Sequence, residues 1–124
     1  MGFNNRIHQE MIRTDKRRSS LQNTDVKGKS LNELAEYCHA IAVEKGFWEQ
    51  ERNIGEALML IVTELAEAME SHRHQDDDNF REELADTFIR LLDLCGGLKI
   101  DIEEEIDKKS QKNKNRPYKH GKIC

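Results

Sequence analysis

One helix-start signal recurs four times after residue 30, and it limits the fold more than any other feature of the chain. Each time, a residue with a short capping side chain is followed three positions later by Glu, which is the spacing of a capping box. The pairs are Ser30/Glu33, Asn53/Glu56, Asn79/Glu82 and Asp101/Glu104. The chain contains only one proline, Pro117, and its charged and apolar fractions are nearly equal at 35% and 36%. The sequence therefore predicts four amphipathic helices and argues against an all-β fold.

Apolar residues at helical spacing extend each start into a helix. The predicted ranges are 31–46, 54–72, 80–95 and 102–116. Gly46 is expected to end the first helix, the pair Gly96 and Gly97 the third, and Pro117 blocks continuation of the fourth. Because the connections are short, sequential neighbours are expected to run antiparallel in an all-α four-helix bundle.

The sequences of two of these helices predict which residues form the core. The second opens on the run 57–62, which is apolar on every side and indicates contacts on more than one side, in a bundle centre or a subunit interface. The third is expected to point its apolar residues inward, namely Phe80, Leu84, Phe88, Leu91, Leu92 and Cys95.

The remaining features of the sequence predict the domain organisation and the cellular location of the protein. Residues 1–29 are polar and are interpreted as an N-terminal arm that precedes one helical domain at 30–124. The net charge of −4 gives no overall attraction to nucleic acid or to an anionic membrane, and no segment approaches the roughly 20 apolar residues of a membrane span. Three cysteines without paired spacing are expected to be reduced, so we expect a cytoplasmic protein.

Two pairs of acidic residues stand out among many. Glu64/Glu67 and Glu83/Asp86 each have a spacing of three, which lets two carboxylates on one helix share a cation. Glu64 also lies in or beside the apolar stripe of its helix, where a carboxylate needs a cation or hydrogen bonds to stay ionised. An all-oxygen ligand set favours Mg²⁺ or Mn²⁺ over zinc. The alternative interpretation is that these are charged helix edges that form salt bridges with Arg81, Arg90 or lysines.

A cationic stripe follows on the fourth helix. Lys109, Asn113 and Arg116 occupy positions i, i+4 and i+7, so they lie on nearly the same face. Such a stripe would neutralise phosphates if it faced a metal-loaded acidic cluster. The alternative is that it only complements the negative end of the helix dipole.

Taken together, these motifs resemble the signature of the MazG-like all-α nucleoside triphosphate pyrophosphohydrolases. The matching elements are Glu64-x-x-Glu67, Glu83-x-x-Asp86 and the downstream segment from Lys109 to Tyr118, and the similarity spans about residues 33–122. The arm has no counterpart in this resemblance.

The resemblance implies hydrolysis of an NTP or dNTP to the monophosphate and pyrophosphate. It implies that the four carboxylates bind Mg²⁺, that Glu64 or Glu67 also orients or deprotonates the attacking water, and that the protein is a homodimer or homotetramer. Lys109, Asn113 and Arg116 would hold the phosphates or the sugar. Trp48 and Tyr118 would be available to stack on a base, although Trp48 would equally suit a packed residue at a helix start.

Two rival functions remain at this point. A helical bundle with the same acidic face could bind a partner protein without catalysis, although intact carboxylates at all four motif positions argue against this. Glu36-x-x-His39 has the spacing used by di-iron helix bundles, but such bundles need the motif on two helices and this chain has one copy.

Overall fold

The computed structural model describes the backbone of residues 26–121, so most of the predicted arm, residues 1–25, lies outside it. Within the described range the chain forms four α-helices and no strand. They are α2 (Leu31–Glu44), α3 (Ile54–Arg73), α4 (Asp77–Gly97) and α5 (Ile102–Lys114), and a short 3-10 helix, η1 (Tyr118–Gly121), follows. The predicted all-α class with four helices is confirmed. None of the helices described has both the length and the apolar character needed to cross a membrane.

Three helix starts form as predicted. Ser30 makes both halves of a capping box with Glu33 at the start of α2. The side chain of Asn53 accepts a hydrogen bond from the amide of Glu56 at the start of α3, and Asp101 caps α5 in the same way. Each cap satisfies an amide that has no partner within its own helix.

The predicted start of α4 is wrong. The helix begins at Asp77 because Asp76, rather than Asn79, is its cap, and the carboxylate of Asp76 accepts from the amide of Asn79. The side chain of Asn79 has another partner, since its amide group donates to the hydroxyl of Ser71 on α3. Asn79, which the sequence predicts to be a cap, thus joins the start of α4 to the end of α3.

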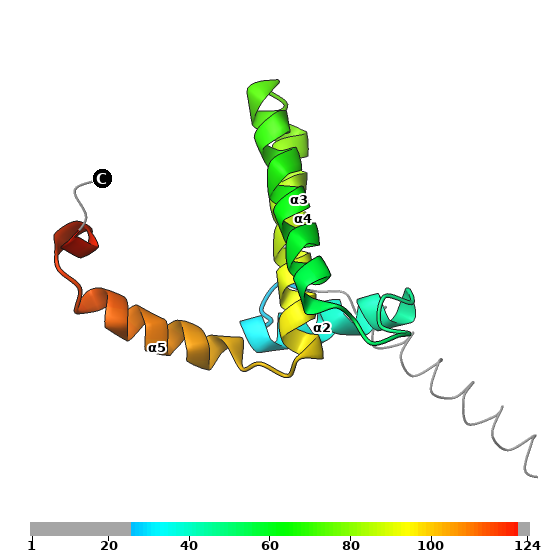
Figure 1. Ribbon diagram of the computed structural model, residues 1–124, viewed down its shortest axis with the longest axis horizontal. Helices are drawn as coiled ribbons and strands as arrows, with labels where there is room; N and C mark the ends of the chain where they lie inside the picture. The colour runs from blue at the N-terminus through cyan, green and yellow to red at the C-terminus, as the bar shows by residue number, and fades with distance from the viewer. Residues whose placement is uncertain (1–25, 122–124) are drawn as a thin grey trace, which may run out of the picture.

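The helices have an uneven arrangement (Figure 1). α3 and α4 pack side by side along their length as an antiparallel pair, and α2 lies across the end of this pair that holds the start of α3 and the last turns of α4. α5 leaves from the same end and points away from the pair, and it contacts α2 near its own first turn. The buried core joins α2 to α4 through Ala35, Cys38, Leu92 and Cys95.

α4 ends at the predicted glycine pair, since Gly96 and Gly97 are its last two residues, although neither has the positive φ of a glycine that caps a helix. A Cβ atom on Gly96 would lie 2.5 Å from the backbone oxygen of Ala35 in α2, and one on Gly97 would clash with the ring of Trp48. The two glycines therefore also allow α2 and Trp48 to approach α4 closely.

The apolar side chains of α3 and α4 are only partly covered. Contrary to prediction, Phe88 and Leu91 do not point into the core, since they are 63% and 41% exposed. They lie on a face of α4 that no other described element covers in the single chain. On α3, several apolar side chains are also about half exposed, among them Leu58, Met59, Val62, Leu65 and Met69. The two helices together present an uncovered apolar face.

α5 is attached to α2 through Asn32. The side-chain oxygen of Asn32 accepts from the amide of Ile102 at 3.0 Å, and its amide group donates to Asp101 at 2.8 Å. The backbone amide of Asn32 donates to Glu103 at 3.2 Å. No residue of α5 is buried beyond this junction, because the helix projects into open space.

Candidate active site

Three of the four predicted carboxylates converge where α3 and α4 face each other. Glu64, Glu83 and Asp86 each place an oxygen within 4.8 Å of the others. They meet because Glu83 and Asp86 share a face of α4, and the antiparallel packing places that face against Glu64 of α3. Glu67, one turn after Glu64, is exposed and lies outside this group of three but interacts with Glu83.

The electrostatics of this group are those of a crowded anionic site. One oxygen of Glu83, Oε2, is buried without a hydrogen-bond partner among the described residues. The pKa of Glu83 is raised from 4.5 to about 7, first through its hydrogen bond with Glu64, then by desolvation and by the neighbouring carboxylate of Glu67. A buried oxygen without a donor and a carboxyl group that retains a proton both indicate missing positive charge.

Glu64 is compensated by an arginine. Burial alone would raise the pKa of this 9%-exposed residue, but hydrogen bonds from Arg90 and Glu83 and the charge of Arg90 lower it overall. The Nε atom of Arg90 donates to Oε1 of Glu64 at 2.7 Å. Glu64 is therefore held ionised and in a fixed orientation before any cation binds.

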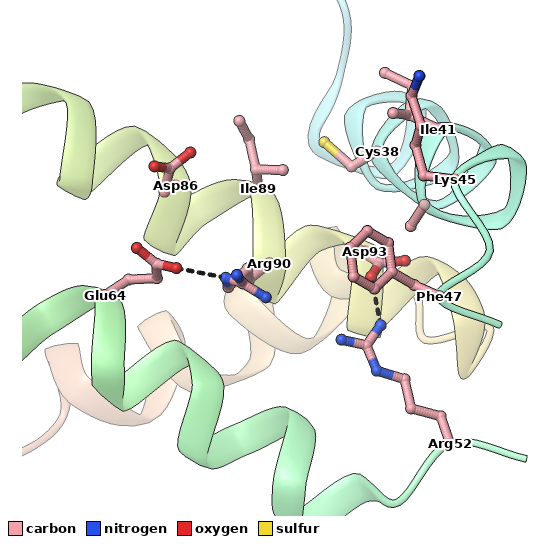
Figure 2. Close-up of a pocket in the computed structure, with 11 residues that line it drawn as sticks. Cys38, Ile41, Lys45, Phe47, Arg52, Glu64, Asp86, Ile89, Arg90 and Asp93 are labelled. Carbon is pink, nitrogen blue, oxygen red and sulfur yellow. Dashed lines mark hydrogen bonds and ion pairs between the residues drawn. The ribbon is translucent and has the colours of Figure 1, made fainter.

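A cavity of about 250 Å³ opens beside Glu64 and Asp86 (Figure 2). One wall is apolar and comes from α2, the following connection and α4. A set of cations also lines it, namely Lys45, Arg52 and Arg90. The cavity thus joins a carboxylate cluster to a space with positive charge and apolar surface, which is a composition suited to a phosphorylated organic molecule.

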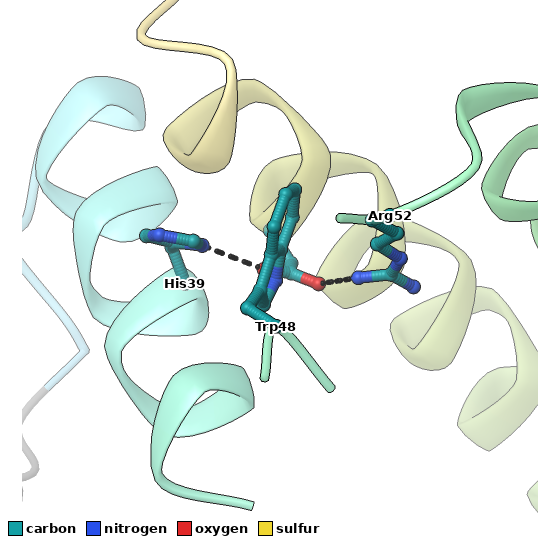
Figure 3. Close-up of polar contacts among 4 residues, drawn as sticks. His39, Trp48 and Arg52 are labelled. Carbon is teal, nitrogen blue, oxygen red and sulfur yellow. Dashed lines mark hydrogen bonds and ion pairs between the residues drawn. The ribbon is translucent and has the colours of Figure 1, made fainter. Parts of the chain in front are cut away.

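A buried carboxylate organises the other end of this cavity (Figure 3). Asp93 is 5% exposed and accepts hydrogen bonds from Nδ1 of His39 at 3.0 Å, from Nε1 of Trp48 at 2.8 Å and from Arg52 at 2.7 Å. Arg52 also lies over the Trp48 ring, 5.0 Å from its centroid. One side chain of α4 thereby fixes α2, the α2–α3 connection and the entry to α3.

The comparison with known families agrees with this geometry. A model of the MazG nucleotide pyrophosphohydrolase domain matches residues 49–120, more than half of the 124 residues. The chain belongs to the MazG family. The matched region contains α3, α4 and α5, and with them all four predicted carboxylates. No curated protein and no solved structure matches the chain significantly.

The carboxylates of this MazG domain fit a divalent cation. Three oxygens within 4.8 Å of one another form an all-oxygen donor set, and one of the three residues, Glu83, also carries the buried Oε2 that has no partner among the described residues. This donor set suits a hard ion such as Mg²⁺ or Mn²⁺. Glu67 lies beside this donor set, since it interacts with Glu83.

The predicted residues of the fourth helix lie elsewhere in the single chain. Lys109 and Asn113 are exposed on α5, and Arg116 and Tyr118 are exposed just beyond it. None of the four lines the cavity, and α5 points away from the carboxylates. Their role in binding substrate stays a prediction. The same is true of Trp48, whose contacts with Asp93 and Gly97 show only how its ring is held.

Three residues that line the cavity were missed at the level of sequence, namely Lys45, Arg52 and Asp93, and Arg90 was expected only as a salt-bridge partner of the carboxylates. Arg90 and Asp93 carried a usable signal. Arg90 follows Asp86 by four residues, so it had to share a face with the motif. Asp93 interrupts the apolar run from Leu91 to Cys95, and an acid in such a run must have buried partners.

The raised pKa of Glu83 leads to a prediction about pH. A carboxyl group whose pKa is higher in the folded protein contributes stability below its unfolded pKa of 4.5 and loses this contribution as pH rises through about 7. The melting temperature of the metal-free protein should therefore fall between about pH 5 and about pH 7, and Mg²⁺ should raise it more at the upper end of this range. Differential scanning fluorimetry with and without EDTA measures both effects.

Glu83→Gln is the control for this pH experiment, because it keeps the shape of the side chain and removes the titrating group. The variant should lose the part of the pH dependence that belongs to Glu83. An equal Mg²⁺ shift at both pH values in the wild-type protein would contradict the link between this proton and the cation.

Proposed function

We propose that this MazG domain is a Mg²⁺-dependent nucleoside triphosphate pyrophosphohydrolase that converts (d)NTP to (d)NMP and pyrophosphate in maintaining nucleotide pools. The observation that carries the proposal is the convergence of Glu64, Glu83 and Asp86 beside a cavity lined by cations. Carboxylates alone would repel a triphosphate, and cations alone would not activate water. The two together are what this reaction requires.

The residues of the chain divide the work of the reaction. Glu64, Glu83 and Asp86 would hold the cation, and Mn²⁺ would be accepted in place of Mg²⁺. Bound there, the ion would neutralise phosphate oxygens and lower the pKa of an attacking water. Glu64 is held in orientation by Arg90, whereas Glu67 is exposed and beside the cluster. Glu67 is thus the better placed of the two glutamates to orient that water and accept its proton as the bond between the α- and β-phosphates breaks.

The cavity would receive the rest of the substrate. Its apolar wall suits the flat face of a base, and Phe47 lies on this wall, whereas Trp48 and Tyr118 do not line the cavity. Lys45 would balance phosphate charge at the cavity wall.

A panel of nucleotides tests the proposed reaction. Incubation with each NTP and dNTP in the presence of Mg²⁺, followed by separation of the products, should yield a monophosphate and pyrophosphate from at least one substrate. Release of orthophosphate together with a diphosphate would refute the proposed bond cleavage. No turnover of any nucleotide would favour a binding module of the same fold.

We further propose that the protein is a homodimer or homotetramer. The uncovered apolar face on α3 and α4, which includes Val62, Leu65 and Phe88, supports this assembly. A partner subunit would also offer a route by which Lys109 and Arg116 reach a carboxylate cluster. Sedimentation equilibrium should give a mass of at least twice the 14.5 kDa chain, and Phe88→Glu should shift it toward the monomer. A wild-type monomer would refute the assembly.

A separate prediction concerns the cations Lys109, on α5, and Arg116, just after it. If Lys109 and Arg116 bind the substrate, Lys109→Ala and Arg116→Ala should each lower kcat/KM by roughly tenfold to a thousandfold, the loss of a charge-assisted contact of about 1.5 to 4 kcal/mol. Mg²⁺ binding without nucleotide should hardly change. Normal kinetics with a stability loss of about 0.3 to 1 kcal/mol would instead mean that the two residues only complement the helix dipole.

A further inference from the structure

Arg90 contacts the carboxylate cluster in an unusual way. Its side chain is one third exposed and reaches Glu64 with Nε, the nitrogen nearest the helix, rather than with a terminal nitrogen. It extends from the same face of α4 as Asp86, one turn later. The ion pair therefore uses one of the five N–H donors of the guanidinium group.

The other donors have no acceptor within the part of the chain that is described. Neither terminal nitrogen of Arg90 donates a hydrogen bond to a residue in the range 26–119. The residue lines the cavity, and Figure 2 shows its guanidinium group between Glu64 and the apolar wall. Arg52 lines the cavity as well, but its guanidinium group is bound to Asp93 and stacked on Trp48.

We propose that Arg90 is a substrate-binding residue, held by Glu64 through Nε and presenting its two terminal nitrogens to phosphate oxygens of the substrate. The proposal rests on the proposed function for the identity of that substrate as a nucleoside triphosphate. In this arrangement, Glu64 holds the cation on one side and the phosphate-binding Arg90 on the other. Charge that develops on the phosphates would then meet a cation that is already oriented.

The planar shape of arginine is essential to this role. A guanidinium group offers donors along two edges, so it pairs with a carboxylate and a phosphate at the same time. A lysine ammonium group is a compact charge on a flexible stem, and it would satisfy Glu64 or the phosphate but would not bridge them in a fixed geometry. Arg90→Lys therefore separates support of Glu64 from binding of an anion.

The experiment compares Arg90→Lys and Arg90→Gln with the wild-type protein. Calorimetry measures two affinities, that for Mg²⁺ without nucleotide and that for inorganic tripolyphosphate in the presence of Mg²⁺. Arg90→Lys should keep the Mg²⁺ affinity within about twofold, because a positive charge remains beside Glu64, and should bind tripolyphosphate at least about tenfold more weakly. Arg90→Gln should lose tripolyphosphate binding and melt at a lower temperature, because Glu64 loses its counter-charge.

Arg81 provides the matched control, since it lies on the same helix, is exposed and does not line the cavity. Arg81→Lys and Arg81→Gln should leave both affinities unchanged. Wild-type tripolyphosphate affinity in Arg90→Lys would overturn the proposal, and so would an equal fall in both affinities, since Arg90 would then only support Glu64. If Arg90→Lys folds poorly, nitrogen-15 NMR spectra of the wild-type protein decide the question. Bound tripolyphosphate should slow the rotation of the terminal nitrogens of one arginine. An unchanged set of arginine signals would refute the contact.

These outcomes separate the inference from the proposed reaction, because tripolyphosphate binding is measured without turnover. A chain that hydrolyses no nucleotide but loses tripolyphosphate binding in Arg90→Lys would refute the reaction and retain the anion site. A chain that hydrolyses dNTPs with unchanged tripolyphosphate binding in this variant would refute the anion site alone.

Discussion

Glu64→Gln and Asp86→Asn are each expected to lower nucleotide turnover by about a hundredfold to ten-thousandfold, because a lost metal ligand removes several kcal/mol of charge stabilisation in the transition state. Both substitutions keep the shape of the side chain. Binding of Mg²⁺ to the nucleotide-free protein should weaken in parallel, which titration calorimetry measures. EDTA should abolish the activity of the wild-type protein, and Mg²⁺ or Mn²⁺ should restore it.

Glu104→Gln is the control for these two variants, because Glu104 is a well-exposed carboxylate on α5 that pairs only with Lys108 among the residues described. Its stability should change by about 1 kcal/mol or less, and its turnover should stay normal. Near-wild-type turnover in Glu64→Gln and Asp86→Asn would show that the reaction does not depend on the cluster.

Asp93→Ala should be the most destabilising single substitution near the cavity, with a loss of about 3 to 5 kcal/mol in the free energy of unfolding. The reason is the number of groups that it leaves without a partner. Arg52 would keep a largely buried charge, and His39 and Trp48 would each lose the acceptor of a ring nitrogen. Urea denaturation followed by circular dichroism measures this loss.

Two further variants test this explanation for Asp93. Asp93→Asn retains one oxygen acceptor and the side-chain volume, so it should lose less stability than Asp93→Ala. Glu82→Ala removes an exposed carboxylate from the same helix and should change stability by about 0.5 kcal/mol or less. If Asp93→Ala were as stable as Glu82→Ala, the three hydrogen bonds of Asp93 would not hold the segments together.

The sequence predicted the parts of this protein that local rules determine. Helix caps depend on residues three apart, so the starts at Ser30, Asn53 and Asp101 could be identified without tertiary information. The carboxylate spacing places Glu83 and Asp86 on one face whatever surrounds the helix. Their approach to Glu64 followed from an antiparallel pair of helices joined by a short connection.

What the sequence did not predict depends on contacts between distant segments. The side chain of Asn79 donates to the hydroxyl of Ser71 on α3 instead of capping its own helix, and the glycines of α4 allow α2 to approach closely. Arg90 and Asp93 carried local signals, but their partners lie 26 and 41 to 54 residues away, and spacing rules do not identify partners at that distance. The exposed Phe88 has the same cause, because helical periodicity marks an apolar face without telling which molecule covers it.

The attachment of α5 near its first turn makes this helix a lever. The helix has 13 residues, and among the described residues it is held at its start by the hydrogen bonds of Asn32 and by the packing of Ile102 against the core. At about 1.5 Å per residue it is about 20 Å long, so a rotation of about 10° at the junction would move its far end by about 3 Å. Lys109 and Arg116 lie toward that far end. If these cations bind substrate as proposed, a change of a few tenths of an ångström at the Asn32 junction would adjust how far they reach, with no change in the helix itself.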